Sequence, residues 1–125
     1  MSRQTVTTNQ IAPPVGPFSP AVRAGGFLFL SGQVAIEPET GALLDGDVAR
    51  QTEQIFRNLA AVLSAAGRSF ADVIKTSVFL TDMNDFSVMN AVYGRYFEPP
   101  YPARTTIGVA ALPLGASVEI DLVVQ

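Results

Sequence analysis

Residues 48–81 read VARQTEQIFRNLAAVLSAAGRSFADVIKTSVFLT and decide the fold, because two different periodicities follow one another in them. Apolar residues first recur at helical spacing and Gly67 ends the pattern, which predicts an amphipathic helix over Val48–Ala66. Asp72–Thr81 is instead β-branched and apolar on both faces, which is typical of a central strand. This pairing of a helix with a buried strand indicates a sheet that carries helices on its surface.

The flanking segments complete an α+β pattern. Two strands are predicted before the helix, over Phe18–Arg23 and Phe27–Ile36, and the polar N-terminal segment is a candidate edge strand. Asn84 is expected to cap a second helix, which a Pro-Pro pair ends. The last two strands are predicted over Arg104–Val109 and Ser117–Val124. The order strand-strand-helix-strand-helix-strand-strand predicts a mixed sheet with both helices on one face.

The composition indicates one apolar domain. The chain has 125 residues, 48% of them hydrophobic and 15% charged, and its mean hydropathy is +0.29. We expect a single domain over residues 1–125, and an oligomer that buries the apolar excess. No apolar run reaches the about 18 residues that span a bilayer, and no secretory signal is visible. No membrane partner is therefore expected, and the expected compartment is the cytoplasm.

The residue types that are missing exclude several classes of site. The chain has no cysteine, histidine or tryptophan, which excludes disulfides, zinc sites built on Cys or His, and nucleophilic triads that need a His base. Acid-base chemistry is left to carboxylates, tyrosine, Lys75 or water. The net charge of −3 and the scattered arginines make nucleic acid a poor partner, because phosphate contacts need clustered cations.

Two charged residues in the predicted C-terminal strands are the first candidates for chemistry. Arg104 begins a strand, and its guanidinium fork matches a carboxylate in bidentate fashion; the alternative is a solvated strand end. Glu119 alternates with Val118 and Ile120 and therefore faces away from the core. A half-buried carboxylate there can position or deprotonate a water, and the alternative is an exposed residue or an ion-pair partner.

Three further positions have both a structural and a functional reading. Ser31-Gly32-Gln33 interrupts an apolar strand, which indicates a plain bulge or close approach of a ligand to the backbone. Lys75 lies within a strand, where a Schiff-base role competes with an aliphatic stem that carries its charge to solvent. Phe86 is either a core residue or the wall of a pocket.

Taken together, the motifs resemble the RidA/YjgF family. PARTTIGVAALP is followed by VEI, whose glutamate comes fifteen residues after Arg104. Upstream lie, in order, GPFSPAV, LSGQV, VARQTEQIFRNL, DVIKTSVFLTDMNDF and NAVYGRYF. These segments run from about Gly16 to the last residue, so the resemblance covers nearly the whole chain.

The resemblance implies a fold, an assembly and an activity. The implied fold is chorismate-mutase-like, and three chains are expected to pack their sheets into a central barrel with a site in each cleft between subunits. The implied reaction is hydrolysis of reactive 2-enamino and 2-imino acids, such as 2-aminoacrylate and 2-iminobutanoate, to 2-oxo acids and ammonia. No cofactor and no metal are expected.

The resemblance also gives roles to particular residues. Arg104 matches the arginine that grips the substrate carboxylate, and Glu119 matches the glutamate that holds or activates the attacking water. Ser31 and Gly32 match a polar strand segment that contacts substrate, and Phe86 matches an aromatic wall.

Two positions depart from the family pattern. Thr106 stands where many relatives have cysteine, so its backbone is expected to contribute to substrate binding. Phe18 stands where archetypal members have tyrosine; its ring keeps the wall of the substrate site but lacks a hydroxyl donor. If that hydroxyl relays a proton, this chain is slower by about 10²-fold, the usual effect of one general acid or base.

Three alternatives to this deaminase stay open at the level of sequence. The first is a non-catalytic sensor that binds a carboxylate metabolite through the same arginine. The second is RNA cleavage, which the acidic balance and the missing histidine oppose. The third is deamination of a different imine in a catabolic pathway.

Overall fold

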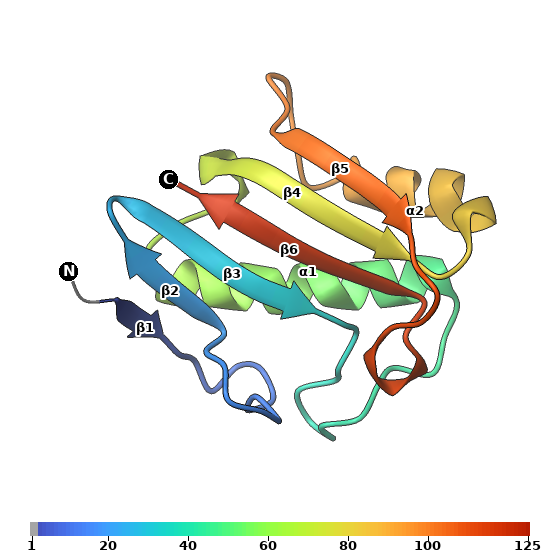
Figure 1. Ribbon diagram of the computed structural model, residues 1–125, viewed down its shortest axis with the longest axis horizontal. Helices are drawn as coiled ribbons and strands as arrows, with labels where there is room; N and C mark the ends of the chain where they lie inside the picture. Colours follow the sequence, from blue (N-terminus) through green and yellow to red (C-terminus); the bar gives the residue numbers. More distant parts are fainter. Residues whose placement is uncertain (1–2) are drawn as a thin grey trace.

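The computed structural model describes residues 3–125, which form a six-stranded mixed sheet with both α-helices on one face (Figure 1). The α-helices are α1 (Val48–Ala65) and α2 (Phe86–Tyr93). The strands are β1 (Gln4–Val6), β2 (Ala21–Ala24), β3 (Phe27–Gln33), β4 (Val73–Leu80), β5 (Ala103–Gly108) and β6 (Val118–Val124), and short 3-10 helices cover Phe70–Asp72, Met83–Asp85 and Pro113–Gly115. The predicted α+β class, the two helices and the candidate edge strand are confirmed.

The strand order is β1-β2-β3-β6-β4-β5, so the last strand of the chain lies in the middle of the sheet. Only the β4–β5 pair is parallel; β6 pairs antiparallel with both β3 and β4. Parallel neighbours need a crossover connection, and α2 supplies it on the face that α1 already covers (Figure 1). The C-terminal strand is thereby buried on the helix side along its whole length.

The core lies between the sheet and the helices. Along β6, Val118, Ile120 and Leu122 face the helices and are at most 1% exposed, while the residues between them are half-buried. Asp47 begins α1, because its side chain accepts a hydrogen bond from the Arg50 backbone N–H at 2.9 Å. The burial along β6 agrees with the alternation expected from sequence.

Three predicted boundaries were wrong. The strand predicted from Phe18 begins at Ala21, so Phe18 lies in the preceding loop. The strand predicted to run to Ile36 ends at Gln33, after a shift of register with β6 that interrupts the pairing. Asn84 caps no helix; its backbone N–H donates to the Asp82 carboxylate at 2.9 Å, and α2 begins only at Phe86.

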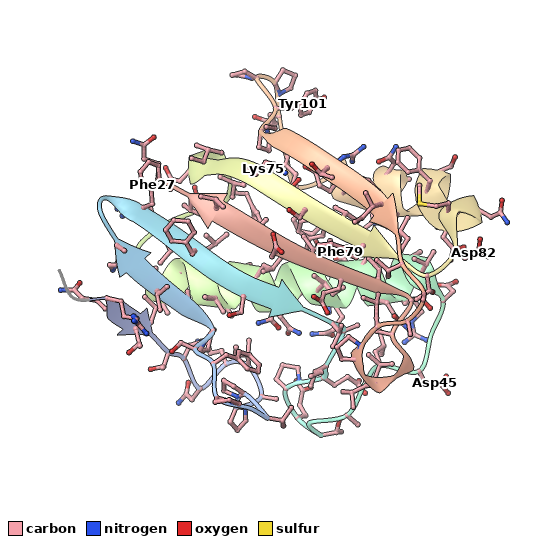
Figure 2. All side chains as sticks on the ribbon, in the orientation of Figure 1. Phe27, Asp45, Lys75, Phe79, Asp82 and Tyr101 are labelled. Carbon is pink, nitrogen blue, oxygen red and sulfur yellow. The ribbon has the colours of Figure 1, made fainter. Side chains whose placement is uncertain are left out.

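The other face of the sheet is not covered within residues 3–125 (Figures 1 and 2). Phe27, Phe29 and Ile107 lie on it and are each between 38% and 44% exposed. Lys75 is half-buried there and donates to the Thr105 hydroxyl at 3.0 Å. Exposed aromatic and branched side chains on one face are typical of a surface that packs against another protein. No helix in the described part of the chain is long and apolar enough to cross a membrane.

Candidate functional site

Arg104 lies on the edge strand β5 and is held by α2. It pairs in register with Thr76, which is fully buried on the helix side, so the Arg104 side chain also points to that side. Its Nη1 donates to Asn90 Oδ1 at 2.8 Å. The guanidinium carbon lies 4.7 Å from the ring centroid of Tyr93 and 5.6 Å from that of Phe86. Residue Arg104 remains exposed, so its other donors can reach a ligand.

Thr106 follows Arg104 by two residues and therefore shares its side of the strand. Its hydroxyl oxygen is buried and has no hydrogen-bond partner among the described residues. We call Arg104, Thr106, Phe86, Asn90 and Tyr93 the clamp half-site.

Glu119 lies on β6 and points to the uncovered face, because its neighbours Val118 and Ile120 face the helices. It is next to Gly32 in the irregular part of β3. A Cβ atom on Gly32 would lie only 3.0 Å from the Glu119 carboxyl carbon, so a side chain at position 32 would displace the carboxylate from this position. Burial raises the pKa of Glu119 above its ordinary value, and the nearby Asp121 carboxylate raises it further.

A cavity of about 220 Å³ lies beside Glu119. It is lined by Glu119, Gly32 and Phe18, and by apolar residues of the loop before β2 and of the turn before β6. Phe18 is 52% exposed, so its ring forms an outer wall rather than part of the core. We call Glu119, Gly32 and Phe18 the acid half-site.

Ser31 is adjacent to the acid half-site, but its polar groups bond to backbone carbonyls of the preceding loop. Its hydroxyl donates to the Ser19 carbonyl at 2.6 Å, and its N–H donates to the Pro20 carbonyl at 3.0 Å. These bonds hold the loop that carries Phe18 against β3. Ser31 therefore positions the wall of the cavity in the isolated chain.

One chain does not bring the two half-sites together. Arg104 points to the helix side of β5, whereas Glu119 points to the uncovered side of β6, and β4 lies between these strands. Lys75 belongs to neither half-site, since it contacts Thr105 on the uncovered face. A Schiff-base role for Lys75 gains no support from this placement.

Sequence reasoning missed Asn90 and the second role of Tyr93. Tyr93 is buried in α2, and its ring also supports the Arg104 guanidinium. The spacing of Phe86, Asn90 and Tyr93, at i, i+4 and i+7, puts all three on one helical face. That spacing was the available signal.

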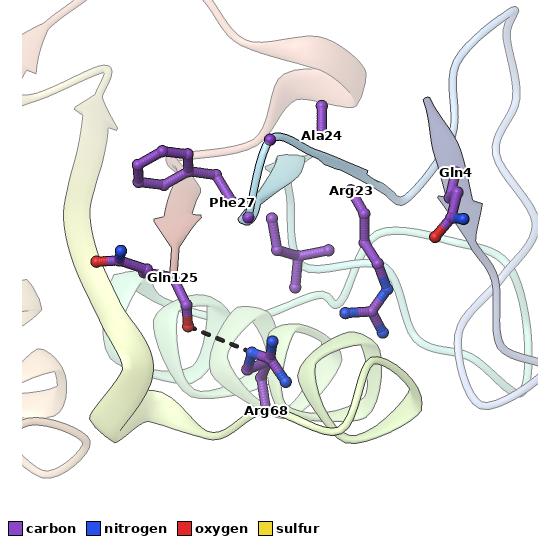
Figure 3. A pocket seen from close by; sticks show the side chains of 9 residues that line it. Gln4, Arg23, Ala24, Phe27, Arg68 and Gln125 are labelled. Atoms are coloured by element: carbon purple, nitrogen blue, oxygen red, sulfur yellow. Dashed lines mark hydrogen bonds between the residues drawn. The ribbon is translucent and has the colours of Figure 1, made fainter. Parts of the chain in front are cut away.

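A second cavity, of about 300 Å³, lies at the β2–β3 hairpin (Figure 3). Arg23 and Arg68 line it, but both guanidinium groups are engaged with the backbone. Arg23 donates to the Ala66 carbonyl at 2.7 Å, and Arg68 donates to the carbonyls of Gly67 and Gln125, each at 3.2 Å. Cations at the carbonyl end of a helix stabilise it, which accounts for both residues without a ligand.

Fold and site together define a small α+β protein with an exposed arginine held against α2 from an edge strand, and comparisons with known proteins identify the family of this protein. The family model described as Endoribonuclease L-PSP matches residues 8–125. A mouse protein named 2-iminobutanoate/2-iminopropanoate deaminase is 41% identical over 121 residues, which are 97% of this chain and 90% of the mouse protein.

Two solved structures extend the comparison. RidA from the Antarctic bacterium Psychrobacter sp. PAMC 21119 is 44% identical, with a TM-score of 0.92, and the match covers 97% of this chain and 98% of that one. Escherichia coli TdcF, solved with bound serine, is 35% identical with a TM-score of 0.90, and the match covers 97% of each chain. The chain belongs to the Endoribonuclease L-PSP family, the RidA/YjgF family that its motifs resemble.

Proposed function

We propose that this chain hydrolyses reactive 2-imino and 2-enamino acids, such as 2-iminobutanoate and 2-aminoacrylate, to 2-oxo acids and ammonia. The observation that carries the proposal is Arg104, which is held against α2 while its remaining donors stay exposed. The name of the mouse relative supports the reaction, and the serine bound to TdcF supports recognition of a carboxylate next to a small side chain. We propose a cytoplasmic reaction that needs no cofactor and no metal.

The chemistry requires one clamp and one proton-transfer group. The Arg104 fork pairs with the substrate carboxylate, and the unpartnered Thr106 hydroxyl is available as a further donor to it. An enamino acid enters the reaction as its imino tautomer. Water attacks C2 of the imine while the Glu119 carboxylate accepts one water proton and passes it to nitrogen, which gives a carbinolamine. The remaining hydroxyl proton of the carbinolamine then passes through Glu119 to nitrogen as the C2=O bond forms and the C–N bond breaks, so ammonia and the 2-oxo acid leave and the carboxylate is regenerated. A raised pKa suits Glu119 to both steps, since a catalytic acid-base group is most effective near the working pH.

This mechanism needs a second copy of the chain. Arg104 and Glu119 point to different sides of the sheet, so we propose that the clamp half-site of one subunit meets the acid half-site of the next. A closed ring of three chains, with the uncovered sheet faces packed into a chorismate-mutase-like barrel, would bury Phe27, Phe29 and Ile107. Each trimer would then hold three sites.

A coupled assay tests the reaction. A threonine dehydratase generates 2-iminobutanoate, semicarbazide traps it, and the protein is added in competition with the trap. We expect wild-type protein to reduce the trapped product and Arg104→Ala to leave it unchanged. If wild-type protein has no effect on trapping, hydrolysis of this imine is refuted.

Phe18 favours a second candidate function, a sensor of carboxylate metabolites. Its phenyl ring lines the acid half-site and brings no hydroxyl there. A sensor would bind 2-oxobutanoate in a calorimetric titration, would lose that binding in Arg104→Ala, and would not accelerate loss of the imine.

A further inference from the structure

We propose that Asn90 is the positioning residue of the arginine clamp: its side-chain amide selects which edge of the Arg104 guanidinium faces the substrate, without neutralising the charge. This inference rests on the proposed function, since it concerns the same site. It starts from the fact that Arg104 is exposed and lies on an edge strand. A free arginine side chain of this kind populates many rotamers, and ordering it on binding costs rotamer entropy.

Two kinds of contact restrain the guanidinium, and they do different things. The rings of Tyr93 and Phe86 limit how far the group can move toward the helix, at 4.7 Å and 5.6 Å from their centroids. A ring face is nearly indifferent to rotation of the cation within its own plane. The bond from Arg104 Nη1 to Asn90 Oδ1, at 2.8 Å, is directional and fixes that rotation.

The support beneath the clamp is itself fixed to the core. The Tyr93 hydroxyl and the Thr76 hydroxyl lie 2.9 Å apart in a buried hydrogen bond, and Thr76 sits beside Arg104 in the sheet register. The hydrogen bond to Thr76 of β4 thus fixes the Tyr93 ring, and the ring supports the guanidinium. The bond to Asn90 sets the direction of the guanidinium. Of these contacts only the Asn90 bond uses a donor of the guanidinium, so four of the five N–H groups remain for a carboxylate.

The choice of a neutral amide matters. A carboxylate at position 90 would accept the same hydrogen bond but would also pair with the positive charge and compete with the substrate. Both ion pairs of the described residues involve Glu53, with Arg57 and with Arg95, and Arg104 takes part in neither. The clamp is therefore oriented by a neutral acceptor and keeps its full charge for the ligand.

Three variants distinguish the orientation of the Arg104 guanidinium, the charge at position 90 and the stability of the fold. Asn90→Ala removes the acceptor, Asn90→Asp keeps an acceptor but adds a negative charge, and Ser87→Ala is a matched control at an exposed position of α2. Loss of a hydrogen bond to a charged group corresponds to about a tenfold change or more in affinity. We expect Asn90→Ala and Asn90→Asp each to raise KM for the imine and the Kd of 2-oxobutanoate at least tenfold, with kcat within about threefold of wild type. Ser87→Ala should match wild type.

A purely structural role for Asn90 gives a different result. It would lower kcat and Tm together, through a smaller folded fraction, and leave KM unchanged. That pattern would overturn the inference, and so would an unchanged KM and Kd in Asn90→Ala. An unchanged KM in Asn90→Asp would refute the argument about charge.

A readout without any ligand keeps this test independent of the proposed function. The Nε–H resonance of Arg104, assigned by its loss in Arg104→Ala, reports the order of the side chain in NMR relaxation. We expect an ordered guanidinium in wild type and Asn90→Asp, and a mobile one in Asn90→Ala. Equal order in wild type and Asn90→Ala refutes the inference. If wild type hydrolyses no imine, the proposed function fails, while NMR and 2-oxobutanoate binding still decide the role of Asn90.

Discussion

Separation of Arg104 and Glu119 on the two sides of the sheet leads to a quantitative prediction about mixed trimers. Two inactive chains, Arg104→Ala and Glu119→Gln, are co-expressed with different affinity tags. Tandem purification then retains only trimers that contain both variants. Each chain alone is expected to be inactive, because every homotypic site lacks either the clamp or the proton-transfer group.

The expected activity follows from counting the junctions in a closed ring. If each site takes Arg104 from one subunit and Glu119 from the next, a mixed trimer of either composition has one junction with both native residues. The doubly tagged trimers should therefore have about one third of the wild-type kcat per trimer, with an unchanged KM.

The assay is the semicarbazide competition with 2-iminobutanoate, and light scattering after gel filtration checks the mass of each assembly. A site built within one chain would leave no complete site in any mixed trimer. Mixed trimers with only the background activity of the single variants would therefore refute the shared site. A wild-type protein that remains monomeric at the assay concentration would refute it too.

Four other predictions concern the acid half-site. Gly32→Ala should lower kcat about tenfold or more, because the new methyl group displaces the Glu119 carboxylate, and circular dichroism should show that the fold is retained. Phe18→Tyr should raise kcat by up to about 10²-fold if a hydroxyl relays a proton at this wall, whereas an equal kcat assigns the ring to packing alone. The acid limb of kcat/KM in wild type should lie above the ordinary glutamate pKa of about 4.3, because activity rises as the carboxyl group with a raised pKa ionises. Because the pKa of Glu119 is higher in the folded chain than in the unfolded chain, the folded chain binds more protons at pH values between these two pKa values. The free energy of unfolding should therefore fall as pH increases through this range. Denaturant titrations at several pH values would show this fall.

The elements with strong periodicity could be predicted from the sequence. The helix expected over Val48–Ala66 is found over Val48–Ala65, and the alternation expected in the last strand places Val118 in the core and Glu119 on the other face. Phe18 was misplaced because the Pro-rich segment before β2 has β-forming residues but no strand partner. Asn84 was misread because Asp82, two residues earlier, supplies the acceptor.

The spatial arrangement of the site residues was harder to predict from the sequence. Alternation states which residues of one strand share a face, but it does not relate the faces of two strands until their register is known. The pairing of Arg104 with the buried Thr76 settles that relation, and it depends on a crossover that no local pattern encodes. Asn90 was missed for a similar reason, since a polar residue on a helix is ordinary until its partner on another element is seen.

A threonine at position 106 makes this part of the chain resistant to reagents that modify thiols. The chain contains no cysteine, and the Thr106 hydroxyl lies on the same side of β5 as Arg104. Thiolates react readily with electrophiles and oxidants, whereas an un-ionised hydroxyl does not. Thiol-directed reagents accordingly find no reactive group at position 106, beside Arg104.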